Sequence, residues 1–177
     1  METREEATTM KLRTFRFLGP IVVLLLAGAG AASAQPAQPD AAPQTPALGD
    51  TIPAFDAQRI DGTMQHVAFP KGQSTVLLFF LSGCPTCHKM IPEWNRSYER
   101  RPSGLTVIGV IMDQEPLGFF DAMPVSFPVV RSPGREFLKA LKVNRAPVTL
   151  RIAPGGKVDD VALGLVDPIR LGELFKK

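Results

Sequence analysis

Cysteine is scarce in this chain of 177 residues, because Cys84 and Cys87 are the two cysteines present. A single potential disulfide cannot hold together a small protein without a core, so the class of disulfide-rich scaffolds is excluded. Histidine is equally scarce, with His66 and His88 as its two examples. Structural zinc takes four Cys or His ligands, and His88 directly follows Cys87, so we expect no metal site.

The sequence also lacks runs of one charge. It has 20 Lys and Arg against 17 Asp and Glu, with a formal net charge of +3, and no run of five or six like charges occurs. Nucleic-acid binding requires basic residues clustered on one surface, so we expect no nucleic-acid partner. The composition, 45% hydrophobic and 21% charged, is that of a globular protein rather than a disordered one.

The N-terminal segment has the pattern of a targeting signal. Basic residues precede an apolar stretch at residues 17–32, and Ala32, Ser33 and Ala34 are the small residues that signal peptidase requires. We therefore predict a signal peptide at residues 1–34 and export to the periplasm or another extracytoplasmic space. The alternative is an uncleaved anchor that would associate the protein with the membrane. It is less favoured because a spanning helix needs roughly 20 apolar residues.

Two regions follow the predicted signal peptide. Residues 35–47 are rich in Pro, Ala and Gln and have no apolar periodicity, which predicts a semi-extended linker. Residues 48–177 then form one domain that is long enough for a core of its own.

Apolar runs alternate with helical patterns through this domain. Continuous apolar runs predict strands buried on both faces of a sheet, and a Gly-rich turn at residues 154–157 predicts a hairpin. We predict strands at 75–81, 105–111, 127–130, 148–152 and 158–165, and helices at 85–100, 134–141 and 168–175. Asp167 is the expected N-cap of the last helix and Pro168 its first residue. The order predicts an α/β fold with a mixed central sheet and helices on both faces.

Both cysteines lie in the short segment Cys84-Pro85-Thr86-Cys87, which directly follows a buried strand. Residues three apart on a first helical turn are neighbours at a separation that a disulfide can bridge, and Pro85 suits that turn. The free N–H groups and the dipole of a helix N-terminus favour a thiolate at Cys84. We therefore predict a catalytic redox pair in which Cys84 attacks a partner disulfide and Cys87, expected to be more buried, resolves the product.

Other interpretations of the same segment stay open at this point. A structural disulfide across so short a loop would stabilise the fold little. With His88 the segment is also C-x-x-C-H, the pattern of haem attachment, although it follows a buried strand in an α/β pattern. We expect His88 to be exposed on the helix. It either is simply solvated or, when protonated, favours the thiolate of Cys84.

Residues 80–92 resemble the active-site strand and helix of the thioredoxin superfamily, and Pro92 matches the proline inside that helix. Residues 145–149 (RAPVT) resemble the loop that carries the family's cis-proline. Residues 48–55 and 61–62 are similar to the opening of the exported TlpA/ResA-like branch. The resemblance covers roughly residues 48–177.

This resemblance implies a thioredoxin-like fold and an enzyme of thiol–disulfide exchange without a cofactor. It implies that Pro147 is cis and that the Ala146 backbone binds an extended client segment beside Cys84. It favours reduction of protein disulfides, for example that of apocytochrome c before haem attachment. Its partners would be protein thiol or disulfide clients and a membrane electron donor of the thiol-reducing type.

The chain departs from the family at three places. Gly83 replaces a tryptophan, and Leu78 replaces a buried aspartate that accepts a proton from the resolving thiol. Either another group, such as water, takes the proton of Cys87, or Cys87 deprotonates slowly. Pro85 and Thr86, which we expect to tune the pair, match neither the usual reducing nor the usual oxidising dipeptide. A peroxiredoxin-like peroxidase is the alternative enzyme, although Leu81 breaks the T-x-x-C context of its nucleophile. A non-enzymatic accessory module is a third hypothesis.

Overall fold

The computed structural model of this protein describes residues 45–176. The signal peptide predicted at residues 1–34 and the linker up to residue 44 lie outside the described residues. Between residues 45 and 176, no helix has the length and apolar character needed to cross a membrane.

A five-stranded mixed sheet forms the centre of the domain, in the order β5-β4-β3-β6-β7. Its strands are β3 (Ser74–Phe80), β4 (Leu105–Ile111), β5 (Val129–Arg131), β6 (Val148–Ile152) and β7 (Val158–Leu163). β3, β4 and β5 are parallel to one another, whereas β6 and β7 are antiparallel to their neighbours. The α/β class, the mixed sheet and the terminal hairpin predicted from the sequence are thus confirmed.

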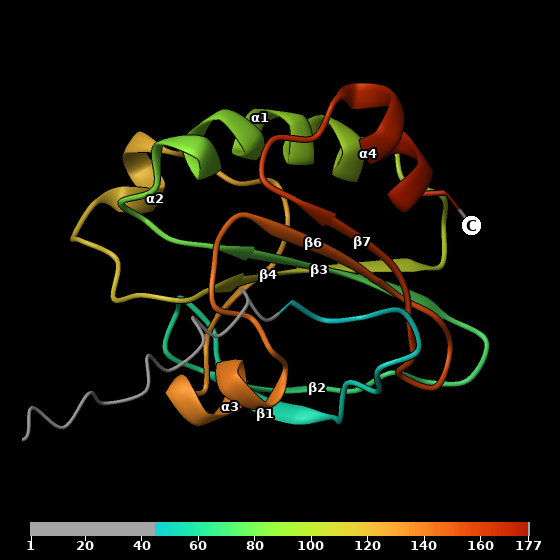
Figure 1. The fold of residues 1–177 in the computed structure, drawn as a ribbon. Helices are drawn as coiled ribbons and strands as arrows, with labels where there is room; N and C mark the ends of the chain where they lie inside the picture. The colour runs from blue at the N-terminus through green and yellow to red at the C-terminus, as the bar shows by residue number, and fades with distance from the viewer. Residues whose placement is uncertain (1–44, 177) are drawn as a thin grey trace, which may run out of the picture. The chain divides into compact units, whose positions relative to one another are not determined.

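Both faces of the sheet are covered, which explains the continuous apolar run of β3 (Figure 1). On one face Val76, Leu78 and Phe80 belong to a core under the two longer helices, α1 (Pro85–Glu99) and α4 (Pro168–Leu174). On the other face Leu77 and Phe79 belong to a second core. That second core is closed by α3 (Arg135–Ala140) and by the antiparallel pair β1 (Phe55–Gln58) and β2 (Met64–Val67).

Helix α1 begins where the local sequence provides an N-terminus. Cys84 is its N-cap, and Pro85 occupies the first turn, where its missing N–H would have no partner. The buried residues of α1 repeat at helical spacing, and they are Cys87, Met90, Ile91 and Trp94. This face lies on the sheet, so the helix places its first turn at the carboxyl end of β3.

Gly109 in β4 lies close to two aromatic side chains. A Cβ at this position would lie 2.8 Å from a ring atom of Phe127 and 3.1 Å from one of Phe80. Those two rings flank Trp94, with ring centroids 6.4 Å and 6.2 Å away respectively. Glycine at 109 therefore leaves room for the aromatic cluster under the first helix.

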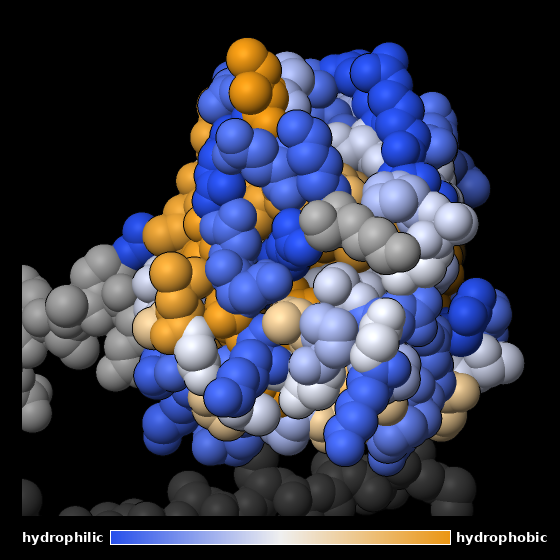
Figure 2. Space-filling model, turned by 90° about the vertical axis from the view of Figure 1, so that its right-hand side faces the viewer, coloured by the Kyte–Doolittle hydropathy of each residue, from blue (hydrophilic) through white to orange (hydrophobic). Residues whose placement is uncertain are grey.

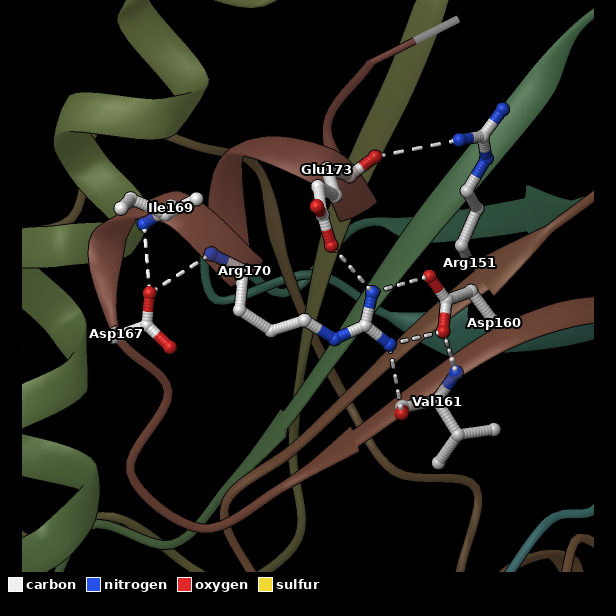
Figure 3. A network of polar contacts seen from close by, with 7 residues as sticks. All are labelled: Arg151, Asp160, Val161, Asp167, Ile169, Arg170 and Glu173. Carbon is white, nitrogen blue, oxygen red and sulfur yellow. Dashed lines mark hydrogen bonds and ion pairs between the residues drawn. The ribbon is translucent and has the colours of Figure 1, made fainter.

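Near the C-terminus, polar contacts cap helix α4 and join it to strand β7. Asp167 caps α4 by accepting hydrogen bonds from the N–H groups of Ile169 and Arg170, as the sequence predicted. Arg170 then reaches from α4 to Asp160 on β7 and also contacts Glu173, and Figure 3 shows this network. Figure 2 shows the right-hand side of Figure 1, where hydrophilic residues cover most of the face and hydrophobic residues gather along one side.

Three elements were missed by the sequence patterns, namely the β1–β2 pair and one helix. The β1–β2 pair consists of strands of four residues, too short for a decisive alternation of apolar and polar residues. The helix α2 (Phe119–Ala122) is equally short, and its N-cap Gly118 has a positive φ of 78° and makes no side-chain cap. α2 follows β4 and packs near the start of α1, where its Phe119 lies beside His88 (Figure 1).

Candidate active site

The two cysteines lie at the carboxyl end of β3, and both are free thiols in this structure. Cys84 is half-buried, whereas Cys87 is fully buried in the core under α1. The N–H of Cys87 donates to Sγ of Cys84 at 3.2 Å. Sγ of Cys84 therefore lies at the N-terminus of α1 and is the more accessible of the two sulfurs, as an attacking residue requires.

Burial raises the pKa of the Cys87 thiol to about 12, since the charged form would lose its hydration in the core. The hydrogen bond with Cys84 adds to this effect, as do the negative charges of Cys84 and Asp113, while the backbone of Leu81 acts in the opposite direction. Cys87 is therefore a neutral thiol at physiological pH, and it must lose a proton before it can attack a disulfide.

The loop before β6 faces Cys84 from the neighbouring strand. β6 pairs with β3 so that Val148 lies opposite Phe79, which brings residues 146–147 to the same end of the sheet as the cysteines. The Ala146–Pro147 peptide bond is cis, as the resemblance implied. Sγ of Cys84 lies 3.9 Å from the carbonyl oxygen of Ala146, the range of a weak S–H donor contact.

Ser82, two residues before Cys84, is held from two directions. Its N–H donates to both carboxylate oxygens of Asp113 at 2.9 and 3.1 Å, and its hydroxyl donates to one of them at 2.8 Å. Its carbonyl lies 2.6 Å from Nε2 of His88. A carbonyl oxygen can only accept, so Nε2 of His88 carries a proton.

The prediction that His88 is exposed was wrong. The ring is half-buried, its Nε2 is engaged by Ser82, and its centroid lies 6.0 Å from that of Phe119 in α2. The unpredicted helix α2 and the loop before Cys84 cover a side chain that the helical pattern alone left in solvent.

Asp113 is the residue of the site that sequence reasoning missed. It follows β4 by two positions and is half-buried beside Ser82. A usable signal was present, since carboxyl ends of adjacent parallel strands meet at one edge of a sheet and an acid follows the run at 105–111. Pro85 is exposed and Thr86 half-buried in the first turn of α1.

The geometry does not fit haem attachment as it stands. Cys87 is 0% exposed, so a thioether could reach it only if the core opened. His88, the iron ligand of that pattern, uses Nε2 on Ser82. His66 lies in the β1–β2 pair, where Nδ1 contacts Asp56 at 2.7 Å, and is not brought to the cysteines. Residues 45–176 contain no cluster of three or more Cys, His, Asp or Glu side chains that could hold a metal ion.

Comparison with known proteins assigns the chain to a family. The model of the Redoxin family matches residues 47–168. Sporulation thiol-disulfide oxidoreductase A of Bacillus subtilis is 26% identical over 153 residues, which cover 81% of this chain and 85% of that protein. A putative peroxiredoxin of Mycobacterium tuberculosis is 31% identical over 96 residues, which cover 52% of this chain and 61% of that protein.

Solved structures with a similar fold include a protein of the same kind. The crystal structure of StoA from Bacillus subtilis superposes with a TM-score of 0.60 at 23% sequence identity, covering 70% of this chain and 96% of that one. The fold is thus thioredoxin-like, and the chain belongs to the Redoxin family. Within that family it is an enzyme of the thiol–disulfide oxidoreductase class.

Proposed function

We propose that this protein reduces disulfide bonds of other proteins outside the cytoplasm, with Cys84 as the attacking residue and Cys87 as the resolving one. One observation carries the proposal. A half-buried sulfur at a helix N-terminus accepts the N–H of Cys87, a buried thiol one turn further along the helix. In this arrangement the accessible sulfur can attack a client disulfide, and the buried thiol can resolve the product.

The reaction proceeds in two exchanges. The Cys84 thiolate attacks one sulfur of the client disulfide, a mixed disulfide forms, and the other client sulfur leaves as a thiolate that takes up a proton. Cys87 then loses its proton and attacks Sγ of Cys84, which releases the second client sulfur. The client gains two electrons and two protons, and the enzyme is left with a Cys84–Cys87 disulfide.

The client segment would lie along the cis-proline loop. Ala146 is half-buried and next to Cys84, so its backbone can hydrogen-bond an extended chain while a client sulfur approaches Sγ. The predicted signal peptide supports exported proteins as clients, with apocytochrome c as one example. A membrane protein of the thiol-reducing type would then return the enzyme to its dithiol form.

Two cysteine variants test the proposal with a fluorescent peptide disulfide as client. We expect Cys84→Ala to reduce the rate to that of the uncatalysed reaction. We expect Cys87→Ala to complete the first exchange and to accumulate a covalent enzyme–peptide adduct visible by mass spectrometry. Full activity of both variants would exclude this function.

Peroxide reduction is the second candidate, because one relative carries the name putative peroxiredoxin. In that case Cys84 would attack hydrogen peroxide, take one oxygen as sulfenate and release water. Adding peroxide to Cys87→Ala and trapping the sulfenate with dimedone distinguishes the two. Rapid sulfenate formation, together with no exchange on the peptide disulfide, would favour the peroxidase.

A further inference from the structure

Asp113 lies close to the redox pair without being matched to a positive charge. Its carboxylate accepts the N–H and the hydroxyl of Ser82, and the ion pairs found among residues 45–176 do not include it. We propose that Asp113 is a positioning residue that fixes the backbone leading into Cys84, and that its negative charge opposes deprotonation of Cys87 in the resolving step. This inference rests on the proposed roles of Cys84 and Cys87.

The positioning part follows from the contacts of Ser82. This residue is 7% exposed and is separated from Cys84 by Gly83 alone, which has no side chain to anchor the turn. Asp113 binds Ser82 through its N–H and hydroxyl, while His88 binds the carbonyl. With Ser82 held on both sides of its peptide, Sγ of Cys84 is kept at the helix N-terminus and beside Ala146.

The electrostatic part follows from what surrounds Cys87. The core cluster that contains Cys87 is otherwise apolar, with side chains from β3, β4, α1 and α4. Asp113 is bonded to Ser82, two residues before Cys84, so its carboxylate lies at the same end of the sheet as the cysteines. Its charge and that of Cys84 both oppose the deprotonation of Cys87. His88, the next residue of α1, directs Nε2 at Ser82.

These two charges do not act at the same stage of the reaction. Once Cys84 has entered a mixed disulfide it has no charge, so its repulsion of a Cys87 thiolate ends. The carboxylate of Asp113 does not take part in the exchange and keeps its charge. Asp113 is therefore the group that still opposes deprotonation of Cys87 at the step where Cys87 must attack, and it prolongs the life of the mixed disulfide.

Its bonding argues against the opposite role, that of a base for Cys87. Both carboxylate oxygens are occupied by Ser82 at 2.8 to 3.1 Å. No hydrogen bond between Asp113 and Cys87 occurs in the described part of the chain. A base would shorten the life of the mixed disulfide, whereas a fixed charge lengthens it. Removing the charge of Asp113 would therefore slow the resolving step in the first case and speed it in the second.

The experiment is stopped-flow mixing of the reduced protein with one equivalent of dithiodipyridine, a neutral disulfide that releases a coloured thiopyridone at each exchange. The first release reports attack by Cys84. The second, which is independent of concentration, reports attack by Cys87 on the mixed disulfide. Absence of two equal releases in the natural protein would contradict the proposed function itself, whereas the variants below test Asp113 alone.

Asp113→Asn keeps an oxygen that can accept the Ser82 N–H but removes the charge. Its first release gives the rate of attack by Cys84 with the acceptor kept and the charge removed. We expect its second release to be about 2- to 5-fold faster at pH 8, with a rate profile displaced to lower pH. Asp113→Ala also removes the acceptor, so its first release should be at least about 2-fold slower than that of Asp113→Asn.

Asp121→Asn is the matched control, because it removes the charge of an exposed carboxylate on nearby α2. We expect both of its releases to be those of the natural protein. An Asp113→Asn protein with an unchanged second release would overturn the electrostatic role, and a slower one would show a base instead. Equal first releases in Asp113→Asn and Asp113→Ala would overturn the positioning role.

Discussion

Two regions of this domain place a carboxylate in opposite environments, one beside a cation and one beside neutral donors. At the β7–α4 edge, Asp160 is paired with Arg170, and this hydrogen-bonded contact holds the pKa of Asp160 below its usual range (Figure 3). At the cysteine end, Asp113 meets the neutral N–H and hydroxyl of Ser82, and its charge helps to raise the pKa of Cys87. A paired charge contributes to stability, whereas a charge without a cation beside a thiol alters the chemistry of that thiol.

Solvent enlarges this difference. Arg170 and Asp160 retain 37% and 26% of their side-chain exposure, so water and salt screen the pair. Cys87 is fully buried among apolar side chains, where the absence of water is the main reason for its raised pKa. We therefore expect substitutions at the first edge to change stability modestly and those at the second to change reactivity strongly.

The largest effect should be the difference in reactivity between the two thiols. In the reduced protein at pH 7, iodoacetamide should modify Cys84 at least about 100-fold faster than Cys87, because the raised pKa leaves Cys87 almost entirely protonated. Peptide mapping of the first adduct measures this ratio. Modification of both cysteines at similar rates would contradict the burial argument.

A smaller effect is expected from the polar contact in the core beneath the cysteines. Nε1 of Trp94 donates to the hydroxyl of Thr149 at 3.1 Å, and both side chains are buried. Trp94→Phe should lower the free energy of unfolding by about 2 kcal/mol, since it removes ring volume and leaves the hydroxyl without its donor. Urea unfolding measures the loss.

Thr149→Val provides the second arm of a double-mutant cycle with Trp94→Phe. If the hydrogen bond accounts for part of the loss, the double variant should lose less stability than the sum of the two single variants. Strictly additive losses would show that packing alone holds Trp94 in place.

The sequence predicted the contacts between residues that are close in the chain and missed those between residues that are far apart. The cysteines are three residues apart, and the strand, proline and helix around them are local, so their arrangement followed from spacing. Asp113 lies 31 positions from Ser82, and the contact exists because β3 and β4 are parallel neighbours. Likewise, His88 is covered by Phe119, which belongs to a four-residue helix with no clear sequence pattern.

The smallest effect should come from the ion pair at the other edge. Asp160→Asn should lower the free energy of unfolding by about 1 kcal/mol at pH 7, the upper range for a partly exposed pair. Because the folded protein lowers the pKa of Asp160, its contribution is complete above the ordinary Asp pKa of about 4 and is lost as the pH falls through the lowered value.

Urea unfolding at several pH values checks this linkage. The difference between the natural protein and Asp160→Asn should narrow in acid and should also narrow in high salt. A difference that stays constant from pH 7 to pH 3 would mean that the charge of Asp160 is not what stabilises this edge.

The central claim is that Cys84 and Cys87 form a reversible redox pair, and the reduction potential of that pair tests it most directly. Equilibration with glutathione or dithiothreitol buffers, followed by mass spectrometry of the trapped thiols, should give a two-electron transition. We expect a potential near that of thioredoxin, about −270 mV, because the proposed function is the reduction of client disulfides. A potential near about −120 mV would indicate an oxidant instead. A potential below about −300 mV, typical of structural disulfides, would contradict the account.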